Sequence, residues 1–323
     1  MNWKTLLKLG CTVLLLGVLG YQQDLRTLAS VIASARLGPL LVAVLLQLSL
    51  TLMAVFRWRI ILGYFTIQIS YLQALRIVFM GNFFSLFLPS AIGGDVFRAY
   101  YVSRHSNKGL SHMLTTTFLD RSAGLCALLL IGLSSSLYSD IAVGGVRLSR
   151  VFIAITTVYF LINVAIFHDW SHRAASRRLT RFGFEALDEK LQLIYEGLRA
   201  LIRAPGSVLV IFGLSLLIQF TAVSVMWFAA RSLSFDSSFF VFLIFIPLVN
   251  LSIMIPITIN GFGLRESVYV LLFAGGLGTQ DEMAFALGLL QGFIVIMVAL
   301  PGGPIYGLYR AEKRQVPDQA TTD

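Results

Sequence analysis

Two segments of the sequence repeat a spacing of proline, glycine and arginine that suits the binding of an anion. Residues 89–98 and 256–265 each read proline, four residues, glycine, three residues, arginine. Proline lacks an amide hydrogen and ends an incoming helix, and glycine permits a tight reversal of the chain. The next helix directs its free N–H groups at the break, where the arginine adds a positive charge. We therefore predict an anion site formed by both segments, which we call the two motifs.

The glycines and arginines of the motifs, with polar and acidic neighbours, are the predicted contacts to this anion. In the first motif and the apolar stretch before it they are Asn82, Gly93, Gly94, Asp95 and Arg98. In the second motif and its apolar stretch they are Asn250, Gly261, Gly263, Arg265 and Glu266. Interrupted segments in corresponding positions of two halves are typical of transporter substrate sites. The alternative is that the motifs form structural hairpins that touch no ligand.

Two adjacent charges, Asp120 and Arg121, lie inside the apolar stretch 113–133, about 12 Å from its start at 1.5 Å per residue. Charges at membrane depth are costly, so they normally face a partner or a cavity. We expect Asp120 to pair with a motif arginine, Arg98 or Arg265. We expect Arg121 to pair with a motif carboxylate. An ion pair that only fastens helices together is the alternative.

Two further arginines adjoin apolar stretches. Arg57 directly follows the apolar stretch 39–56, and Arg76 lies within the less regular apolar stretch 71–88. We predict that both contact the same ligand; the alternatives are an interfacial anchor at Arg57 and a snorkelling side chain at Arg76. The sequence shows no catalytic motif, nucleotide-binding loop or metal-ligand spacing. It therefore predicts a protein that is not an enzyme and that uses no metal or cofactor.

The composition indicates that these residues lie in a membrane protein. Of 323 residues, 57% are hydrophobic and 13% are charged, about half of the roughly 25% found in soluble proteins. Such a chain has too few polar residues to cover a soluble fold, which excludes a soluble enzyme and a disordered chain. The net charge of +9 comes from basic residues in loops, which favours lipid headgroups over nucleic acid as partners.

The elements that position the site are predicted to be helices of an all-α integral membrane bundle. Six apolar stretches are candidates to span a bilayer, at residues 5–20, 39–56, 113–133, 151–167, 207–230 and 284–300. Two others, 71–88 and 239–255, run into the motif prolines, and a short apolar piece at 267–278 follows the second. We expect these two to form re-entrant broken-helix hairpins with an inverted-repeat relation between them.

The distribution of basic residues supports this topology, because cytoplasmic loops of membrane proteins carry an excess of Lys and Arg. With two re-entrant hairpins, 17 Lys and Arg residues lie inside, five lie outside and three lie at membrane depth. We therefore expect a multi-pass protein of the cell inner (plasma) membrane with both termini in the cytoplasm. Eight or nine plain spans are the alternative.

The chain is predicted to form one membrane domain over residues 1–310, followed by a polar tail at 311–323. Apolar residues recur every three or four positions over 185–203, which predicts an amphipathic helix. We expect this helix either to lie on the inner leaflet or to cap the bundle from the cytoplasm.

The motifs and the intramembrane charges together resemble those of a known family. The matching pieces are Arg57-Trp58, the first motif with Asn82, Asp120-Arg121 with Gly124, and the second motif with Gly263 and Glu266. Over roughly residues 5–310 the chain resembles the integral membrane, flippase-like domain of lysylphosphatidylglycerol synthases. The resemblance implies an inner-membrane bundle that binds and translocates lipids with charged headgroups, such as aminoacylated phosphatidylglycerol. Full-length synthases add a soluble aminoacyltransferase domain; this sequence ends at Asp323 without one, so we expect a stand-alone member that lacks the synthase reaction.

Three functions compete at this point. The first is flippase-like translocation of a phospholipid or polyprenyl-phosphate lipid whose headgroup carries phosphate, with or without an aminoacyl or glycosyl group. The second is an accessory role, in which the protein presents lipid to a membrane or cytoplasmic transferase through its basic segment 173–203. The third is a membrane enzyme that uses Asp120 or Glu266 as acid or base. The charged, broken-helix site favours the first.

Overall fold

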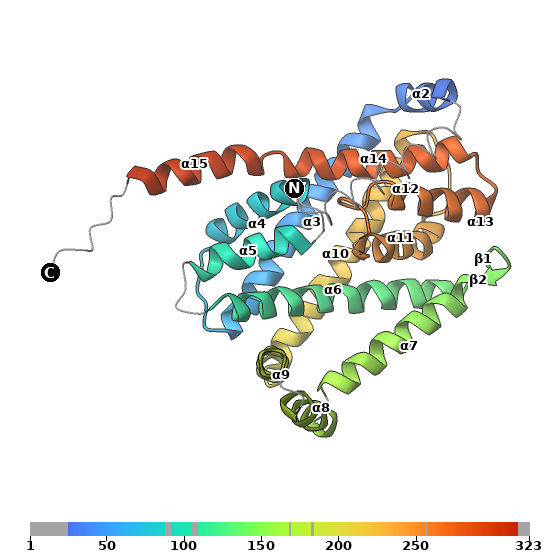
Figure 1. Ribbon diagram of the computed structural model, residues 1–323. Coiled ribbons are helices and arrows are strands. Elements are labelled where there is room, and N and C mark those ends of the chain that lie inside the picture. The colour runs from blue at the N-terminus through green and yellow to red at the C-terminus, as the bar shows by residue number, and fades with distance from the viewer. Residues whose placement is uncertain are drawn as a thin grey trace.

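The protein is an all-helical bundle of the membrane type (Figure 1). The computed structural model describes residues 25–87, 92–104, 109–167, 169–181, 184–255 and 257–315. In that part of the chain, the only strands are β1 (Ala142–Val143) and β2 (Val146–Arg147), which form a small antiparallel turn between two helices. The predicted all-α fold is confirmed.

Among the described residues, five helices are long and apolar enough to cross a membrane. They are α3 (Leu37–Tyr64), α6 (Leu110–Leu137), α7 (Leu148–Phe167), α10 (Pro205–Ser232) and α14 (Asp281–Ala299). A helix of 28 residues, such as α6, measures about 42 Å, longer than the ~30 Å hydrocarbon core. These helices confirm five of the six predicted spans and make the chain a multi-pass membrane protein; the predicted span 5–20 lies outside the described residues.

The first hairpin consists of α4 (Tyr71–Ser85) and α5 (Ile92–Ser103), which lie side by side (Figure 1). A reciprocal cap starts α4, because the Ser70 hydroxyl accepts from the Gln73 amide while the Gln73 side chain accepts from the Ser70 amide. At 15 and 12 residues, the two helices measure about 22 and 18 Å, too short to span the hydrocarbon core alone. The predicted break at Pro89 lies outside the described residues.

Two glycines bring the helices of this hairpin together. A Cβ atom on Gly94 of α5 would overlap the Gly81 carbonyl oxygen and the Ser85 hydroxyl of α4. A Cβ atom on Gly81 would in turn meet the aliphatic part of Arg98 at 2.7 Å. Close backbone contact of this kind is what small residues provide in membrane helices. The glycines therefore fix the position from which Arg98 leaves α5.

The second hairpin consists of α11 (Phe239–Met254) and a helical segment formed by α12 (Leu264–Tyr269), the π-helical η1 (Val270–Ala274) and α13 (Gly275–Leu277). Between them the chain turns with positive φ angles at Asn260 (49°), Gly261 (78°) and Gly263 (85°). Glycine adopts such angles without a steric penalty, which explains the two glycines of this motif. Pro256, the predicted helix breaker, lies outside the described residues.

Both predicted stretches therefore fold as broken-helix hairpins. Their depth in a bilayer and the inverted-repeat relation between them remain predictions. In Figure 1 the first hairpin lies on the left of the bundle and the second on the right, and α6 packs on α5 of the first and on α11 of the second.

The amphipathic segment also folds as predicted, as α9 (Glu185–Ile202), next to the basic α8 (Asp169–Arg181). Helix α9 contacts α6, α10 and α3, and a Cβ atom on Gly197 would overlap the ring of Phe65. This packing supports the alternative in which the helix caps the bundle.

The chain leaves the bundle through α15 (Gly302–Gln315), which packs on α4. The predicted boundary at residue 311 lies within this helix, because residues 311–315 continue it. Residues 316–323 of the predicted tail lie outside the described residues. At the opposite end of the described chain, the short α2 (Leu25–Ala33) packs on α14.

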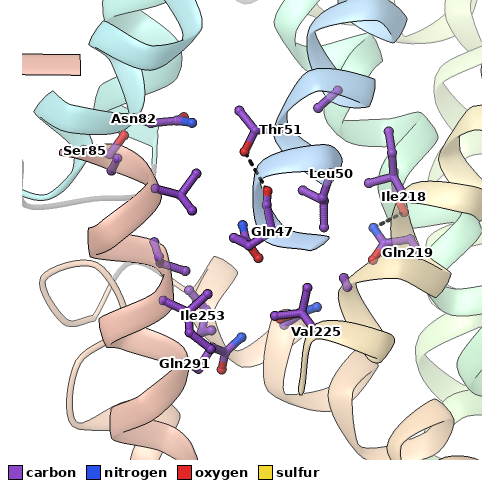
Figure 2. A pocket seen from close by; sticks show the side chains of 18 of the residues that line it. Gln47, Leu50, Thr51, Asn82, Ser85, Ile218, Gln219, Val225, Ile253 and Gln291 are labelled. Atoms are coloured by element: carbon purple, nitrogen blue, oxygen red, sulfur yellow. Dashed lines mark hydrogen bonds between the residues drawn. The ribbon is translucent and has the colours of Figure 1, made fainter. Parts of the chain in front are cut away.

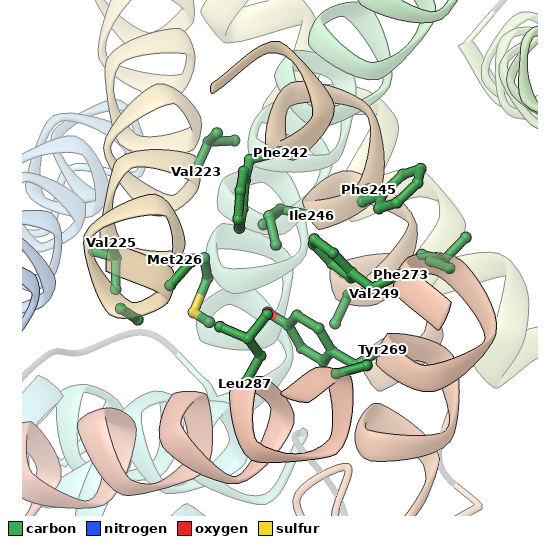
Figure 3. Close-up of a cluster of buried hydrophobic side chains, with 14 of the residues drawn as sticks. Val223, Val225, Met226, Phe242, Phe245, Ile246, Val249, Tyr269, Phe273 and Leu287 are labelled. Atoms are coloured by element: carbon green, nitrogen blue, oxygen red, sulfur yellow. The ribbon is translucent and has the colours of Figure 1, made fainter. Parts of the chain in front are cut away.

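Two apolar cores hold the bundle together. One is centred on α10, α11, η1 and α14, where Figure 3 shows Phe242, Phe245 and Tyr269 around Phe273, with ring centroids 4.9 to 5.6 Å from that of Phe273. The other is centred on α3, α4 and α5 around the buried Trp58. The candidate site lies where residues of both cores meet.

Candidate functional site

A cavity of about 410 Å³ lies between the two hairpins and the long helices α3, α6, α10 and α14 (Figure 2). Seven of the predicted site residues line it, although they are up to 208 positions apart in the sequence (265 minus 57). They are Arg57, Asn82, Arg98, Asp120, Arg121, Asn250 and Arg265. The corresponding arginine and asparagine of each motif thus reach one common space.

One carboxylate, Asp95, is shared by two arginines. Arg121 donates to it through two parallel bonds, Nε to Oδ2 at 2.9 Å and Nη2 to Oδ1 at 3.0 Å. Arg98 donates from Nη2 to the same Oδ1 atom. The prediction that Arg121 pairs with a motif carboxylate is confirmed. The Arg121 side chain is 54% accessible whereas that of Arg98 is 9% accessible, so Arg121 presents the more open cation.

Asp120 has a different partner from the one predicted. It accepts from Arg57 Nε at 2.8 Å, and Arg57 Nη1 donates to the Ser215 hydroxyl of α10 at 2.9 Å. Consecutive residues of a helix point about 100° apart, so Asp120 faces α3 while Arg121 faces α5. The expected pairing of Asp120 with Arg98 or Arg265 was therefore wrong. The alternative interpretation of Arg57 as an interfacial anchor was also wrong, because its side chain is 6% accessible and ion-paired inside the bundle.

Arg265 is held by its own motif. Its Nη2 and Nε atoms donate to Glu266 Oε1 at 2.6 and 3.1 Å, and the other oxygen of Glu266 accepts from the Gly263 amide at 2.6 Å. The guanidinium lies 4.7 Å from the centre of the Phe262 ring, and Gly292 of α14 leaves room for it. Glu266 is fully buried behind Arg265 and outside the cavity wall, so it positions the arginine.

The other predicted contacts also lie off the cavity wall. Gly94 packs against α4, and Gly261 and Gly263 form the turn of the second hairpin. Asp95 lies behind the two arginines that it binds. The remaining two predicted contacts are Gly93, which is half-buried in the first turn of α5, and Arg76, which is exposed on α4. These residues do not line the cavity, so they do not make the predicted direct contact with a ligand. They pack the hairpins or hold the arginines in place, except for Arg76, which lies apart from the cavity.

The sequence analysis missed several polar residues of the cavity wall. Four are carboxamides, and two are hydroxyl residues: Gln47, Gln219, Asn260, Gln291, Thr51 and Ser85. The signal was present, because Gln47, Gln219 and Gln291 are the only carboxamides in the predicted spans that contain them. A lone carboxamide in an apolar helix is costly unless it has a hydrogen-bonding role.

The charges around the cavity leave a positive excess. Of the described residues, four arginines line the cavity (Arg57, Arg98, Arg121, Arg265), and three carboxylates pair with them (Asp95, Asp120, Glu266). Four positive and three negative charges give a net charge of +1. In addition, the buried Nε atom of Arg98 has no hydrogen-bond acceptor among the described residues. The cavity can therefore accept an anion with further hydrogen-bond acceptors.

Comparison with known proteins agrees with this architecture. A family model described as the lysylphosphatidylglycerol synthase TM region matches residues 5–302 of the 323 residues, and this family indicates a lipid-related function in a membrane. No curated protein and no solved structure matches the chain. Because one family model covers the two hairpins, the long helices and every lining residue of the cavity, the chain belongs to the family of lysylphosphatidylglycerol synthase transmembrane regions.

Proposed function

We propose that the protein binds the phosphate-containing headgroup of a membrane lipid in this cavity and translocates the lipid across the plasma membrane. The observation that carries the proposal is the convergence of four arginines between two broken-helix hairpins, where the three paired carboxylates leave a net charge of +1. Broken helices at corresponding positions are typical of transporter substrate sites. The headgroup classes considered are those of phospholipids and polyprenyl phosphates, with or without an aminoacyl or glycosyl group.

The geometry favours a phosphate over a neutral headgroup. A phosphate oxygen can accept from the free Nε of Arg98 and from the accessible guanidinium of Arg121. Hydrogen bonds between charged partners are roughly twice as strong as those between neutral partners. A neutral headgroup would displace water from these arginines without replacing its hydrogen bonds. Binding of an anion therefore compensates the excess charge, and the headgroup can then cross the bilayer within the cavity.

The proposal includes the orientation of the protein in the membrane and the driving force of lipid movement. We place both termini in the cytoplasm, because this topology keeps 17 of the 25 Lys and Arg residues inside. The protein is proposed to act as a transporter rather than an enzyme, driven by the lipid gradient or by coupling to an ion gradient.

A second candidate function is the presentation of lipid to a separate transferase. The observation that favours it is the exposed basic surface of α8, formed by Arg173, Arg177, Arg178 and Arg181. A membrane or cytoplasmic transferase with an acidic surface could dock there. Co-purification of a transferase, together with lipid binding but no lipid movement by the pure protein, would favour this function.

Reconstitution into liposomes tests the primary proposal. Phosphatidylglycerol labelled in one acyl chain is added, and the fraction accessible to a membrane-impermeant quencher is measured over time. The wild type should increase the rate of lipid movement, and the double variant R98Q/R265Q should abolish the increase. The control is R147Q/R231Q, which removes two exposed arginines that do not line the cavity. Equal rates for the folded R98Q/R265Q variant and the wild type would contradict the proposal.

A further inference from the structure

The cavity has a second kind of polar wall beside the arginines. Six carboxamide side chains line it, one each from α3, α4, α10 and α14, one from α11 and one from the turn of the second hairpin: Gln47, Asn82, Gln219, Gln291, Asn250 and Asn260. Each carboxamide is neutral and carries both a hydrogen-bond donor and an acceptor. Such a wall does not add to the recognition of a charge, but it suits groups that both donate and accept, as hydroxyls do.

Part of this wall has unused hydrogen-bonding capacity. The Oε1 atom of Gln291 is buried and has no hydrogen-bond donor among the described residues. Figure 2 shows Gln47, Asn82 and Gln291 extending from α3, α4 and α14 toward the same space. A buried acceptor without a donor is costly, and a hydroxyl of a bound ligand would satisfy it. Gln219 differs, because its Nε2 atom already donates to the Gly124 carbonyl oxygen at 3.1 Å.

The charges argue against a cationic headgroup. Asp120 is the only carboxylate among the described lining residues, and its Oδ1 atom is 2.8 Å from Arg57 Nε. Asp95 and Glu266 lie behind the wall and are ion-paired with arginines as well. An ammonium group in the cavity would therefore meet four guanidinium groups without a carboxylate of its own. This conflicts with the aminoacylated headgroup that the family resemblance implies.

The volume fits a small headgroup. A cavity of about 410 Å³ falls within the range of roughly 300–1,000 Å³ that is typical of small-molecule sites. A phosphate has five non-hydrogen atoms, so there is room beside it for an uncharged group of similar or somewhat larger size. Glycerol and a small sugar both fall in that class.

We propose that the cavity selects a phosphodiester headgroup that carries an uncharged polyol, with the phosphate on the arginines and the hydroxyls on Gln47, Asn82 and Gln291. This inference rests on the proposed function and narrows it, because it excludes the cationic aminoacyl headgroup as the preferred ligand. The same chemistry occurs in a lipid headgroup and in a soluble glycerol phosphodiester, and the protein is inferred to take the lipid.

Matched lipids test the inference directly. The full chain is placed in nanodiscs of neutral phosphatidylcholine that contain equal small fractions of two test lipids, and bound lipid is measured by native mass spectrometry. Phosphatidylglycerol and phosphatidylethanol carry the same single negative charge and differ in their hydroxyl groups. Because a hydrogen bond changes affinity by about 2- to 10-fold, phosphatidylglycerol should be preferred by at least about fivefold. Lysylphosphatidylglycerol should bind more weakly than phosphatidylglycerol.

Single substitutions assign the preference to the carboxamides. Q47M and Q291M keep the side-chain length and remove the hydrogen-bonding groups, so each should reduce the preference by about 2- to 10-fold without changing phosphatidylethanol binding. The control Q192M changes an exposed glutamine of α9 and should leave the preference unchanged. Soluble glycerophosphoglycerol should fail to displace the bound lipid at equal concentration; complete displacement would identify the soluble molecule as the ligand and overturn the lipid assignment.

The outcomes separate this inference from the proposed function. The polyol inference would be overturned if the wild type bound phosphatidylglycerol and phosphatidylethanol equally, or if it preferred lysylphosphatidylglycerol. Both outcomes are measured on the wild-type protein alone. In either case R98Q/R265Q would still lose phospholipid binding if the proposed function holds. If phospholipid binding is unchanged in R98Q/R265Q, the proposed function itself fails.

Discussion

At the scale of single residues, the site depends on how each buried charge is compensated. Asp95 serves two arginines, whereas Asp120 and Glu266 serve one each. Removing one partner of a buried pair leaves the other charge stranded, while removing both partners together can cost little. The four ion pairs around the cavity therefore differ in what their loss should do to stability.

The Arg57–Asp120 pair allows a quantitative prediction. D120L should destabilise the protein by about 3–5 kcal/mol, because Arg57 is left buried without its carboxylate. The double variant R57M/D120L should be more stable than D120L, because neither charge is then present. Thermal unfolding in detergent measures both effects.

The control for this prediction is the exposed Arg147–Asp140 pair, whose side chains are 58% and 88% accessible. Exposed pairs contribute little, so D140L should leave the unfolding temperature nearly unchanged. A double variant that is less stable than D120L would show that Arg57 has stabilising contacts beyond the ion pair.

At the scale of elements, the legs of the first hairpin are held together by glycine contacts. G94A would place a methyl group into the Gly81 carbonyl oxygen and the Ser85 hydroxyl. Because backbone cannot yield as a side chain can, we expect a loss of about 1–3 kcal/mol in stability and slower lipid movement, since Arg98 is displaced with α5. Thermal unfolding and the liposome assay measure the two effects.

The matched control is G213A in α10, where an added Cβ atom meets no neighbouring atom within 4 Å. In a helix interior, alanine in place of glycine should stabilise by roughly 0.5–1 kcal/mol. If G94A behaved like G213A, the close packing of α4 on α5 would be wrong.

Elements were far more predictable from the sequence than contacts. The apolar stretches gave the five described long helices, because length and hydrophobicity alone decide whether a helix can span a bilayer. The proline and glycine spacing predicted both hairpins, because these two residue types determine the local backbone conformation. The partner of Asp120 was not predictable, because it depends on the rotation of α6 relative to α3. The carboxamides were overlooked because a single polar residue in a span does not form a motif.

At the scale of the whole molecule, the described helices predict which ends of the bundle share a side of the membrane. Tyr138 lies between α6 and β1, and Gln192 lies on α9. In the topology that the basic residues favour, these two residues are on opposite sides of the membrane. In a background with both native cysteines replaced, Y138C should react with a membrane-impermeant maleimide only from outside the cell. Q192C should react only from the cytoplasmic side, and both can be compared in right-side-out and inside-out vesicles.

Labelling of both positions from the same side would contradict the topology and favour a different number of spans. The same reagent tests the depth of the hairpins: cysteines at positions 90 and 258 should react more slowly than Y138C and Q192C from either side, because the motif turns are expected within the bilayer thickness. Labelling as fast as at those exposed positions would contradict this expectation. Thr258 is 2% accessible in the folded protein, in agreement with a protected turn.

The consecutive residues Asp120 and Arg121 have a mechanical consequence. They are joined by a single peptide bond of α6, yet Asp120 is ion-paired with Arg57 of α3 and Arg121 is ion-paired with Asp95 of α5. Helix α6 is therefore linked by ion pairs both to the long helix α3 and to α5, the second helix of the first hairpin. A ligand anion that competes with Asp95 for Arg121 would loosen the fastening to α5 while the fastening to α3 holds. If the proposed headgroup binds Arg121, its competition with Asp95 would favour movement of the first hairpin relative to α3 and α6.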